Sequence, residues 1–410
     1  MPSIINATVT SGLTANSDVS GNLIFQTSSN NVLTLDSSQN ATFAGSVSAP
    51  NTFGFKNRII NGNMGIWQRG NTTTAATNTV GYYNVDRFLL NMGNSTNGKV
   101  TLAQSTDTPT GQGFPYSLLV TCSNTESSIG STQYSTIVQV IESQNISDVA
   151  YGTNQAKTIT LSYWIKMNIT GTFPAVMVQR PASTQRAFPW VVNYATANTW
   201  QKVVVTVPGD IAGTLPFSNV AGLEIDFCYL AAGSNYQNGT ANTWNVNSGA
   251  NQYMPSGYTY TNFLSTIGNT FQITGVQLET GSQATPFDFR DITRELQLCQ
   301  RYYYRTDGNS TGGAILMVGS YAYSTSNAAQ SMCTFPVTMR AAPTSTFGGS
   351  VSLQQPAGNW PITRITNSPN STTQGAVSFG IGTASLTVGA VTQVFVSTVG
   401  PGYVDFSAEL

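Results

Sequence analysis

The chain has 410 residues, of which 16 are basic and 17 are acidic, and it contains no histidine. Charged residues make up 8% of the sequence, against about 25% in ordinary soluble domains. The net charge of −1 gives no electrostatic reason to bind nucleic acid or an anionic membrane. The absence of histidine excludes Ser-His-Asp and Cys-His catalysis and histidine metal sites. Ser, Thr, Asn, Gln and Gly replace the missing charges, a balance typical of β-structure.

Targeting and redox signals are absent from the sequence. The four cysteines, Cys122, Cys228, Cys299 and Cys333, are far apart and fit neither a disulfide framework nor a zinc site. Residues 1–12 lack a basic segment followed by an apolar run, so no secretory signal is expected. No stretch approaches the about 18 apolar residues that span a membrane. We therefore expect assembly in a reducing cytoplasm, with no membrane insertion, no cofactor and no metal.

Residues 1–52 form a distinct N-terminal region with few charges. Three short segments begin at Asn22, Asn31 and Asn40, nine residues apart. Each carries an apolar pair in alternation with polar residues, namely Leu23/Phe25, Leu33/Leu35 and Ala41/Phe43. Strands this short cannot bury a core alone. We expect a fibre-shaft segment in which several chains wind around each other, with a flexible polar leader as the alternative.

Residues 53–290 contain the longest strand-like runs. Most of these runs alternate apolar with polar residues, as half-buried antiparallel strands do. They are 99–104, 116–123, 133–142, 157–167, 200–208, 221–232 and 271–280. Gly, Asn and Pro clusters separate them, and no helical pattern intervenes. The sequence therefore predicts an all-β fold with a central jelly-roll β-sandwich, in which we expect Trp164 to lie in the core.

A single short helix is predicted after the sandwich. Within residues 291–305, Ile292, Leu296, Cys299 and Tyr303 recur at helical spacing, and Asp291 is the expected N-cap. The polar residues of the segment, including Glu295, are expected to point away from this apolar stripe. Residues 308–410 return to short strand patterns at 312–323, 331–338, 376–382, 392–398 and 403–410. We therefore expect residues 291–410 to form a linking helix and a C-terminal β-rich tip domain.

Several of these segments resemble parts of bacteriophage tail-fibre and related virion structural proteins. NRIINGNMGIWQRG at 57–70 and YYNVDRFLL at 82–90 are similar to the entry of the carbohydrate-binding-module-like jelly roll in that group. Residues 273–305 resemble its last strand and following helix, FPVTMRAAPT at 335–344 the start of the C-terminal domain, and LTLDSSQNATFAG at 33–45 a fibre leader.

This resemblance implies a homotrimer located in the virion. It also implies that the N-terminal segment attaches to other virion proteins of the tail, baseplate or capsid, and that the protein mediates adsorption to a host cell-surface glycan. In a trimer, three linked sites can raise avidity by about 10²–10⁴-fold without any new contact.

One carboxylate pair is worth weighing as a catalytic site. Glu224 and Asp226 are two apart in a predicted strand, which places their side chains roughly 7 Å apart on one face. Inverting glycosidases separate their carboxylates by about 6.5–9.5 Å. The alternatives are a solvated strand face or a Ca²⁺ ligand pair. Because neither residue has a visible device for shifting its pKa, we expect no catalytic residues and no enzyme activity.

Glycan binding is the favoured function, because sugars are held by aromatic faces and by amide and hydroxyl groups. The candidate ligand contacts in the Gly/Asn-rich segment 233–263 are Tyr236, Trp244, Tyr253, Tyr258 and Tyr260. Trp360, in the turn-rich sequence PAGNWPITR, is a further candidate. Alternatively, these aromatics cover the sandwich edge or a subunit interface. The other functions left open are a virion-associated polysaccharide depolymerase and a decoration protein that binds no receptor.

Overall fold

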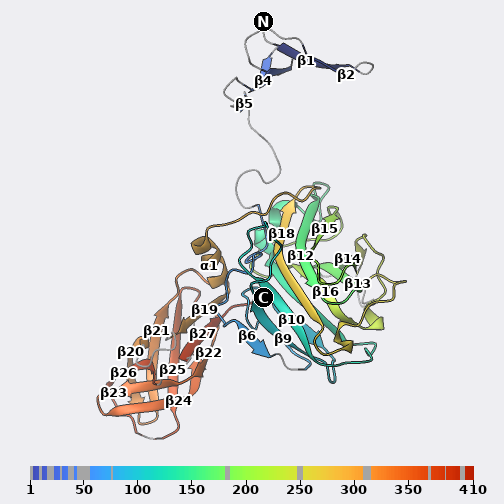
Figure 1. Cartoon of the computed structure of the whole chain (residues 1–410). Helices are drawn as coiled ribbons and strands as arrows, with labels where there is room; N and C mark the ends of the chain where they lie inside the picture. Colours follow the sequence, from blue (N-terminus) through green and yellow to red (C-terminus); the bar gives the residue numbers. More distant parts are fainter. Residues whose placement is uncertain are drawn as a thin grey trace. The chain divides into compact units, whose positions relative to one another are not determined.

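Figure 1 shows the computed structural model of the chain. The structure describes residues 3–8, 12–15, 23–27, 30–35, 41–43, 56–74, 77–180, 185–246, 253–307, 315–367, 371–383, 385–397 and 402–410. The chain divides into two compact units, Met1–Gly54 and Phe55–Leu410. In the described ranges, no helix has the length and apolar character needed to cross a membrane.

The first unit is a five-stranded sheet with the order β2-β1-β3-β4-β5. Its strands are β1 (Ser3–Thr8), β2 (Gly12–Ala15), β3 (Leu23–Thr27), β4 (Asn30–Leu35) and β5 (Ala41–Phe43). The apolar pairs predicted from the sequence lie opposite one another within this single chain, because Leu23 pairs with Leu35 and Leu33 pairs with both Phe25 and Phe43. The winding of several chains around each other stays a prediction.

A six-stranded antiparallel sheet forms one layer of the second unit. Its strands are β6 (Thr72–Thr74), β9 (Lys99–Ser105), β10 (Ser117–Asn124), β12 (Ile159–Met167), β15 (Gln201–Val207) and β18 (Thr270–Thr280). Their order is β15-β12-β18-β10-β9-β6, and β12 and β18 lie side by side (Figure 1).

A seven-stranded antiparallel sheet forms the facing layer, with the order β17-β14-β13-β16-β11-β8-β7. Its strands are β7 (Val80–Gly81), β8 (Leu89–Gly93), β11 (Tyr134–Glu142), β13 (Gly171–Gln179), β14 (Arg186–Tyr194), β16 (Ala221–Ala232) and β17 (Asn245–Val246). Short 3₁₀ turns lie at Ser143–Asn145, Ser147–Val149, Ser234–Tyr236 and Phe263–Ser265. The all-β fold with a jelly-roll sandwich is therefore confirmed.

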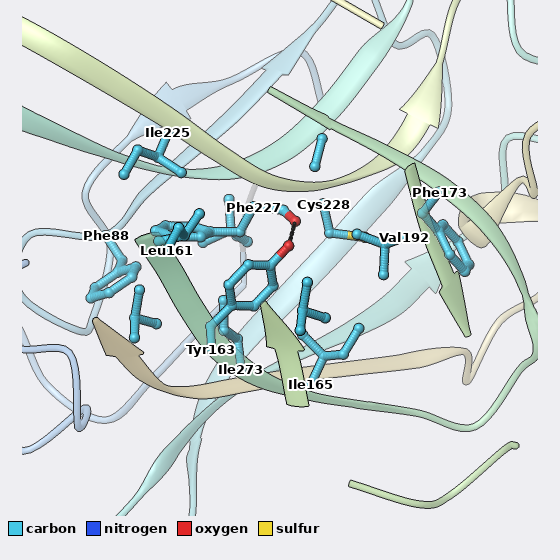
Figure 2. Packing of buried hydrophobic residues seen from close by; sticks show 14 of the residues in the cluster. Phe88, Leu161, Tyr163, Ile165, Phe173, Val192, Ile225, Phe227, Cys228 and Ile273 are labelled. Carbon is cyan, nitrogen blue, oxygen red and sulfur yellow. Dashed lines mark hydrogen bonds between the residues drawn. The ribbon is translucent and has the colours of Figure 1, made fainter. Parts of the chain in front are cut away.

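The core lies between the two sheets and takes one face of each strand. Tyr163 of β12 is fully buried in it, and its hydroxyl donates a hydrogen bond of 2.9 Å to the Phe227 carbonyl of β16 (Figure 2). The expectation that Trp164 belongs to this core is wrong. Tyr163 and Ile165 fill the core positions of β12, and strand alternation therefore turns Trp164 to the outer face of the sheet.

All seven sandwich strands predicted from apolar alternation are present. The two long strands that the sequence pattern did not indicate are β13 and β14, which pair along their whole length. Each contains a proline, Pro174 and Pro189. Proline lowers the expectation of a strand because it cannot donate to the ladder, and burial of both strands outweighs that cost.

The predicted helix is confirmed as α1 (Ile292–Gln300), and Asp291 caps it. The Asp291 carboxylate accepts hydrogen bonds from the backbone N–H groups of Thr293 (2.9 Å) and Arg294 (3.4 Å). The predicted apolar stripe is wrong in part. Ile292 is exposed, whereas Glu295 is buried, because its carboxylate pairs with Arg290 at 3.1 Å and accepts the N–H of Asn61.

The C-terminal region contains a closed barrel of six strands, in the order β20-β21-β25-β24-β23-β26. They are β20 (Ile315–Ser324), β21 (Asn327–Thr334), β23 (Val351–Gln355), β24 (Gly358–Asn367), β25 (Gln374–Ile381) and β26 (Val391–Val396). A three-stranded sheet joins β19 (Tyr303–Asp307), β27 (Gly402–Ser407) and β22 (Thr344–Gly349) in that order.

The end of the chain is held by buried charges and aromatic rings. Arg69 pairs with Asp86 and with Glu409, each at 2.9 Å, and Arg87 pairs with Glu409 as well. The guanidinium of Arg69 lies 3.4 Å from the centre of the Tyr303 ring. Stacking on an aromatic face and ion pairing satisfy a buried guanidinium together. We name this cluster the arginine clasp: Arg69, Asp86, Arg87, Tyr302, Tyr303 and Glu409.

Three of the five segments that resemble fibre proteins contribute to this clasp, and a fourth contacts the end of the chain beside it. Residues 57–70, 82–90 and 273–305 supply all of its members except Glu409. Residues 335–344 supply Arg340, which donates hydrogen bonds to the carbonyls of Ala408 (2.7 Å) and Glu409 (2.8 Å). These segments therefore form scaffold.

Candidate functional site

The segment that follows β16 folds over the outer face of the seven-stranded sheet. Met254 is fully buried there against Val176 and Val178 of β13, and Tyr253 and Tyr260 pack on the same cluster. Val176 and Val178 point to the face of β13 opposite the sandwich core, because side chains alternate along a strand. Without the segment that follows β16, this face would be exposed to solvent. The segment thus creates a small second core outside the sandwich.

A hollow of about 250 Å³ lies beside this cluster. We name it the tyrosine pocket, and its lining consists of Asn91, Tyr134, Arg180, Glu224, Tyr229, Tyr236 and Tyr253. Two of the predicted ligand contacts, Tyr236 and Tyr253, therefore come together in one site. Whether they bind a glycan stays a prediction.

The tyrosine rings of this pocket are held in fixed orientations. The Tyr134 and Tyr236 rings meet edge to face with centres 5.5 Å apart, and the Tyr236 and Tyr253 rings meet at 6.1 Å. The Tyr236 hydroxyl donates to the Thr132 carbonyl at 3.3 Å. Gly93, the cross-strand partner of Tyr134, leaves room for its ring, because a Cβ there would lie 2.4 Å from it.

A salt bridge lies at the base of the pocket. The Arg180 guanidinium contacts both Glu224 carboxylate oxygens, with Nε–Oε2 at 2.6 Å and Nη2–Oε1 at 3.0 Å. This two-point geometry is the strong form of an arginine–carboxylate pair. Burial raises the pKa of Glu224, and the charge of Arg180 opposes that rise. We assign the ionised form to Glu224, so the pair is neutral overall.

Asp226, two residues from Glu224 on β16, is the carboxyl of this pair whose pKa is raised more strongly. It is 1% exposed, and burial followed by the charge of Glu224 raises its pKa well above the usual range. The Tyr229 hydroxyl donates a hydrogen bond of 2.9 Å to Asp226 Oδ2. The expectation that neither carboxylate has a device for shifting its pKa is therefore wrong. The alternative that the two residues lie on a solvated strand face is also wrong, because tertiary packing buries both of them.

The remaining predicted contacts lie elsewhere. Trp244 packs at the edge of the main core, 5.5 Å from the Phe188 ring and 5.8 Å from the Tyr151 ring, and its Nε1–H donates to the Pro208 carbonyl at 2.8 Å. Tyr258 is exposed and stacks on Tyr260 at 6.0 Å.

Trp360 lies on strand β24, directly opposite Leu353 of β23, and packs against the core of the barrel. Its assignment to a turn-rich stretch is wrong, because the turn is limited to Pro356 and Ala357. These placements separate Trp244, Tyr258 and Trp360 from the lining of the tyrosine pocket.

Four lining residues, Asn91, Tyr134, Arg180 and Tyr229, were not singled out from the sequence, and Tyr229 shows why. Tyr229 follows Leu223, Ile225 and Phe227 in odd numbering, which predicts a core-facing side chain. The ladder between β16 and β11 contains an irregularity, since Asp226 pairs with Val138 but Tyr229 pairs with Thr136. This bulge reverses the alternation and turns Tyr229 to the outer face.

A metal site is not evident in this region. Within the described ranges, no group of three or more Cys, Asp or Glu side chains is arranged to hold a metal ion. The four cysteines are free thiols.

Comparisons with known proteins give structural similarity only. No protein-family model matches the sequence, and no curated protein matches it. The enzymatically active domain of tailspike protein 4 from bacteriophage CBA120 matches with 14% identity and a TM-score of 0.28, over 55% of this chain and 22% of that chain. The match thus spans less than a quarter of the tailspike's length.

Two carbohydrate-binding modules match over similar parts of the chain. The family 11 module from Clostridium thermocellum matches with 11% identity and a TM-score of 0.25, over 52% of this chain and 98% of that chain. The CBM22-2 xylan-binding domain from Paenibacillus barcinonensis Xyn10C matches with 12% identity and a TM-score of 0.25, over 54% and 97%. At these identities and TM-scores, we draw no functional conclusion from the similarity.

Proposed function

We propose that this chain is a bacteriophage virion fibre protein that binds a host cell-surface glycan in the tyrosine pocket. The observation that carries the proposal is the placement of four tyrosines around one hollow, above a neutralised Arg180–Glu224 pair. Saccharides are bound by aromatic faces together with a few fixed polar groups. The assignment to a virion rests on the resemblance of the segments at 33–45, 57–70, 82–90, 273–305 and 335–344.

The pocket chemistry favours an uncharged sugar. Arg180 is engaged by Glu224, so neither presents a free charge, and the buried Asp226 does not line the pocket. The Asn91 amide supplies a donor and an acceptor for sugar hydroxyl groups. The hydroxyls of Tyr229, Tyr236 and Tyr253 already donate within the protein, so their oxygens serve as acceptors. The fixed ring orientations reduce the conformational entropy that binding would otherwise cost.

Glycan binding is tested with the purified full-length chain on an array of bacterial surface glycans. Titration calorimetry with the strongest neutral oligosaccharide follows. We expect Tyr253→Ala to weaken binding at least tenfold. The matched control is Tyr321→Ala, since Tyr321 of β20 is 55% exposed and lies outside the pocket. Equal binding by the wild type and Tyr253→Ala, or binding to no neutral glycan at all, would refute the assignment of this site.

We also propose that the protein is a homotrimer that attaches to other virion proteins through residues 1–52. Light scattering at micromolar concentration should give three times the mass of one chain. A monomer would contradict this proposal. Removal of residues 1–52 should abolish incorporation into particles and leave glycan binding by the tyrosine pocket unchanged.

A polysaccharide depolymerase is the second candidate, because glycosidases use two neighbouring carboxyl groups of which one has a raised pKa, and the pKa of Asp226 is raised beside Glu224. Asp226, however, is enclosed and does not line the pocket. A general acid must reach the glycosidic oxygen to protonate it, so we propose that the protein is not an enzyme. Release of reducing sugar by the wild type but not by Glu224→Gln would establish the depolymerase instead.

A further inference from the structure

A second hollow, of about 330 Å³, opens on the outer face of the six-stranded sheet. We name it the Trp164 pocket. The residues that line it are Gly111, Gln112, Phe114, Ser162, Trp164, Lys202, Gly275, Thr285, Pro286, Phe287 and Phe289. None of them belongs to the tyrosine pocket, which is formed by the other sheet.

A bulge in β18 makes room for the aromatic base of this pocket. The ladder shifts register between Ser162, which pairs with Gln277, and Trp164, which pairs with Thr274. Gly275 lies in the bulge with φ of 62°, and a Cβ there would lie 2.5 Å from the Phe114 ring and 2.9 Å from Trp164. Glycine is therefore required both for the left-handed backbone and for the close approach of two rings.

Three phenylalanines form a wall of the pocket. Phe114 and Phe287 meet edge to face at 5.1 Å, Phe287 and Phe289 meet at 4.8 Å, and Phe289 is 52% exposed. The half-exposed Phe289 and the half-buried Trp164 both contribute apolar ring surface to one hollow. Such faces are what the apolar side of a sugar ring contacts.

The wall is fixed by hydrogen bonds. The Thr285 hydroxyl and N–H donate to Glu279 at 2.6 and 2.9 Å, and the Asp288 N–H donates to Gln277 Oε1 at 2.8 Å. Glu279 is 1% exposed, so its carboxylate serves these donors beneath the wall. The pocket is consequently formed before any ligand arrives.

Lys202 gives the pocket its charge. It lies directly across the ladder from Trp164, is exposed, and is the one charged residue among the described residues of the lining. Its neighbour Lys166 is paired with Asp107 at 2.7 Å. In the described part of the chain, Lys202 has no ion pair. The pocket thus offers an unpaired ammonium beside an indole. A ligand that complements both has a ring that stacks on the indole and an acidic group that reaches the ammonium.

We propose that the Trp164 pocket binds a saccharide that carries a carboxylate. The sugar ring stacks on Trp164, its carboxylate contacts the Lys202 ammonium, and the exposed Gln112 amide hydrogen-bonds to its hydroxyl groups. This inference does not depend on the proposed function of the tyrosine pocket. It gives the chain two sites of different specificity, one for a neutral and one for an acidic sugar.

Titration calorimetry on the full-length chain tests the proposal with three acidic probes: trigalacturonate, a hyaluronan hexasaccharide and 3′-sialyllactose. At least one of them should bind, and Lys202→Met and Trp164→Ala should each weaken that binding at least tenfold. The matched control is Lys157→Met, because Lys157 is also exposed but lies outside the pocket. Tyr253→Ala should leave binding unchanged, which separates this site from the tyrosine pocket.

The methyl ester of the bound probe isolates the role of the charge. We expect the ester to bind wild type at least tenfold more weakly than the acid, and to bind Lys202→Met as it binds wild type. Failure of all three acids to bind at millimolar concentration would overturn the inference. Equal affinity of wild type and Lys202→Met for the acid would do the same, as would a loss in Lys157→Met as large as in Lys202→Met.

Discussion

Replacement of Glu126 by Gln should destabilise the sandwich in a manner that depends on pH. Glu126 Oε2 accepts the backbone N–H groups of Thr96 and Asn97, each at 2.9 Å, and of Gly98 at 3.3 Å. Partial burial opposes ionisation, but these donors outweigh it and lower the pKa of Glu126 to about 2, from 4.5. Because Glu126 is 7% exposed, the lowered pKa converts to a stabilisation of about 3 kcal/mol at pH 7.

The sign follows from the lowered pKa. The stabilisation is fully present above pH 4.5 and is lost as the pH falls through 2, so the difference between wild type and Glu126→Gln at pH 3 should be about half that at pH 7. Urea unfolding followed by tryptophan fluorescence at both pH values measures it. Asp148→Asn is the control, since it removes an exposed pair with Arg58 worth less than about 1 kcal/mol. A Glu126→Gln effect of equal size at both pH values would refute the reasoning.

Three further changes have defined outcomes. Gly275→Ala should lower stability by about 2–4 kcal/mol in urea unfolding, because the new Cβ meets Phe114 and the backbone is left-handed; a change below about 0.5 kcal/mol would contradict the packing. Glu409→Gln should cost about 3–5 kcal/mol, since it leaves Arg87 buried without its ion pair, and an unchanged unfolding midpoint would contradict the clasp. Because the folded-state pKa of Asp226 is raised, wild type should lose stability as the pH rises above about 4 until that carboxyl ionises, and Asp226→Asn should remove this slope in thermal melts between pH 4 and 9.

Much of the fold follows from apolar alternation, and the exceptions have physical causes. In the six-stranded sheet, β9, β10 and β15 alternate buried with less buried residues, so their period of two is visible in the sequence. The strand that carries Pro174 is buried on both faces and paired on both edges, which a local pattern with a proline does not indicate. For α1, the capping residue Asp291 was visible, but the burial of Glu295 depends on Arg290 and on the distant Asn61.

The candidate site was predictable only in part. The aromatic content of residues 233–263 pointed to Tyr236 and Tyr253, but equally to Trp244, Tyr258 and Tyr260, which do not line the pocket. Tyr134 and Tyr229 lie on strands, where an aromatic residue ordinarily indicates core. The bulge in β16 turns Tyr229 to the outer face, whereas Tyr134 lies there by alternation with the core residues Ile137 and Ile141 of β11. The segment that follows β16 packs against both tyrosines and makes them part of a pocket. The raised pKa of Asp226 likewise depends on tertiary burial, which no spacing in the sequence reports.

The ion pair between Glu224 and Arg180 determines how binding in the tyrosine pocket responds to salt. A pocket without a free charge binds equally well in dilute and in concentrated salt. The Lys202 ammonium, by contrast, acts over a Debye length that shortens from about 30 Å at 0.01 M to about 10 Å at 0.1 M ionic strength. If both pockets bind sugars as proposed, ionic strength alone would shift the relative affinity of the chain for neutral and for acidic saccharides.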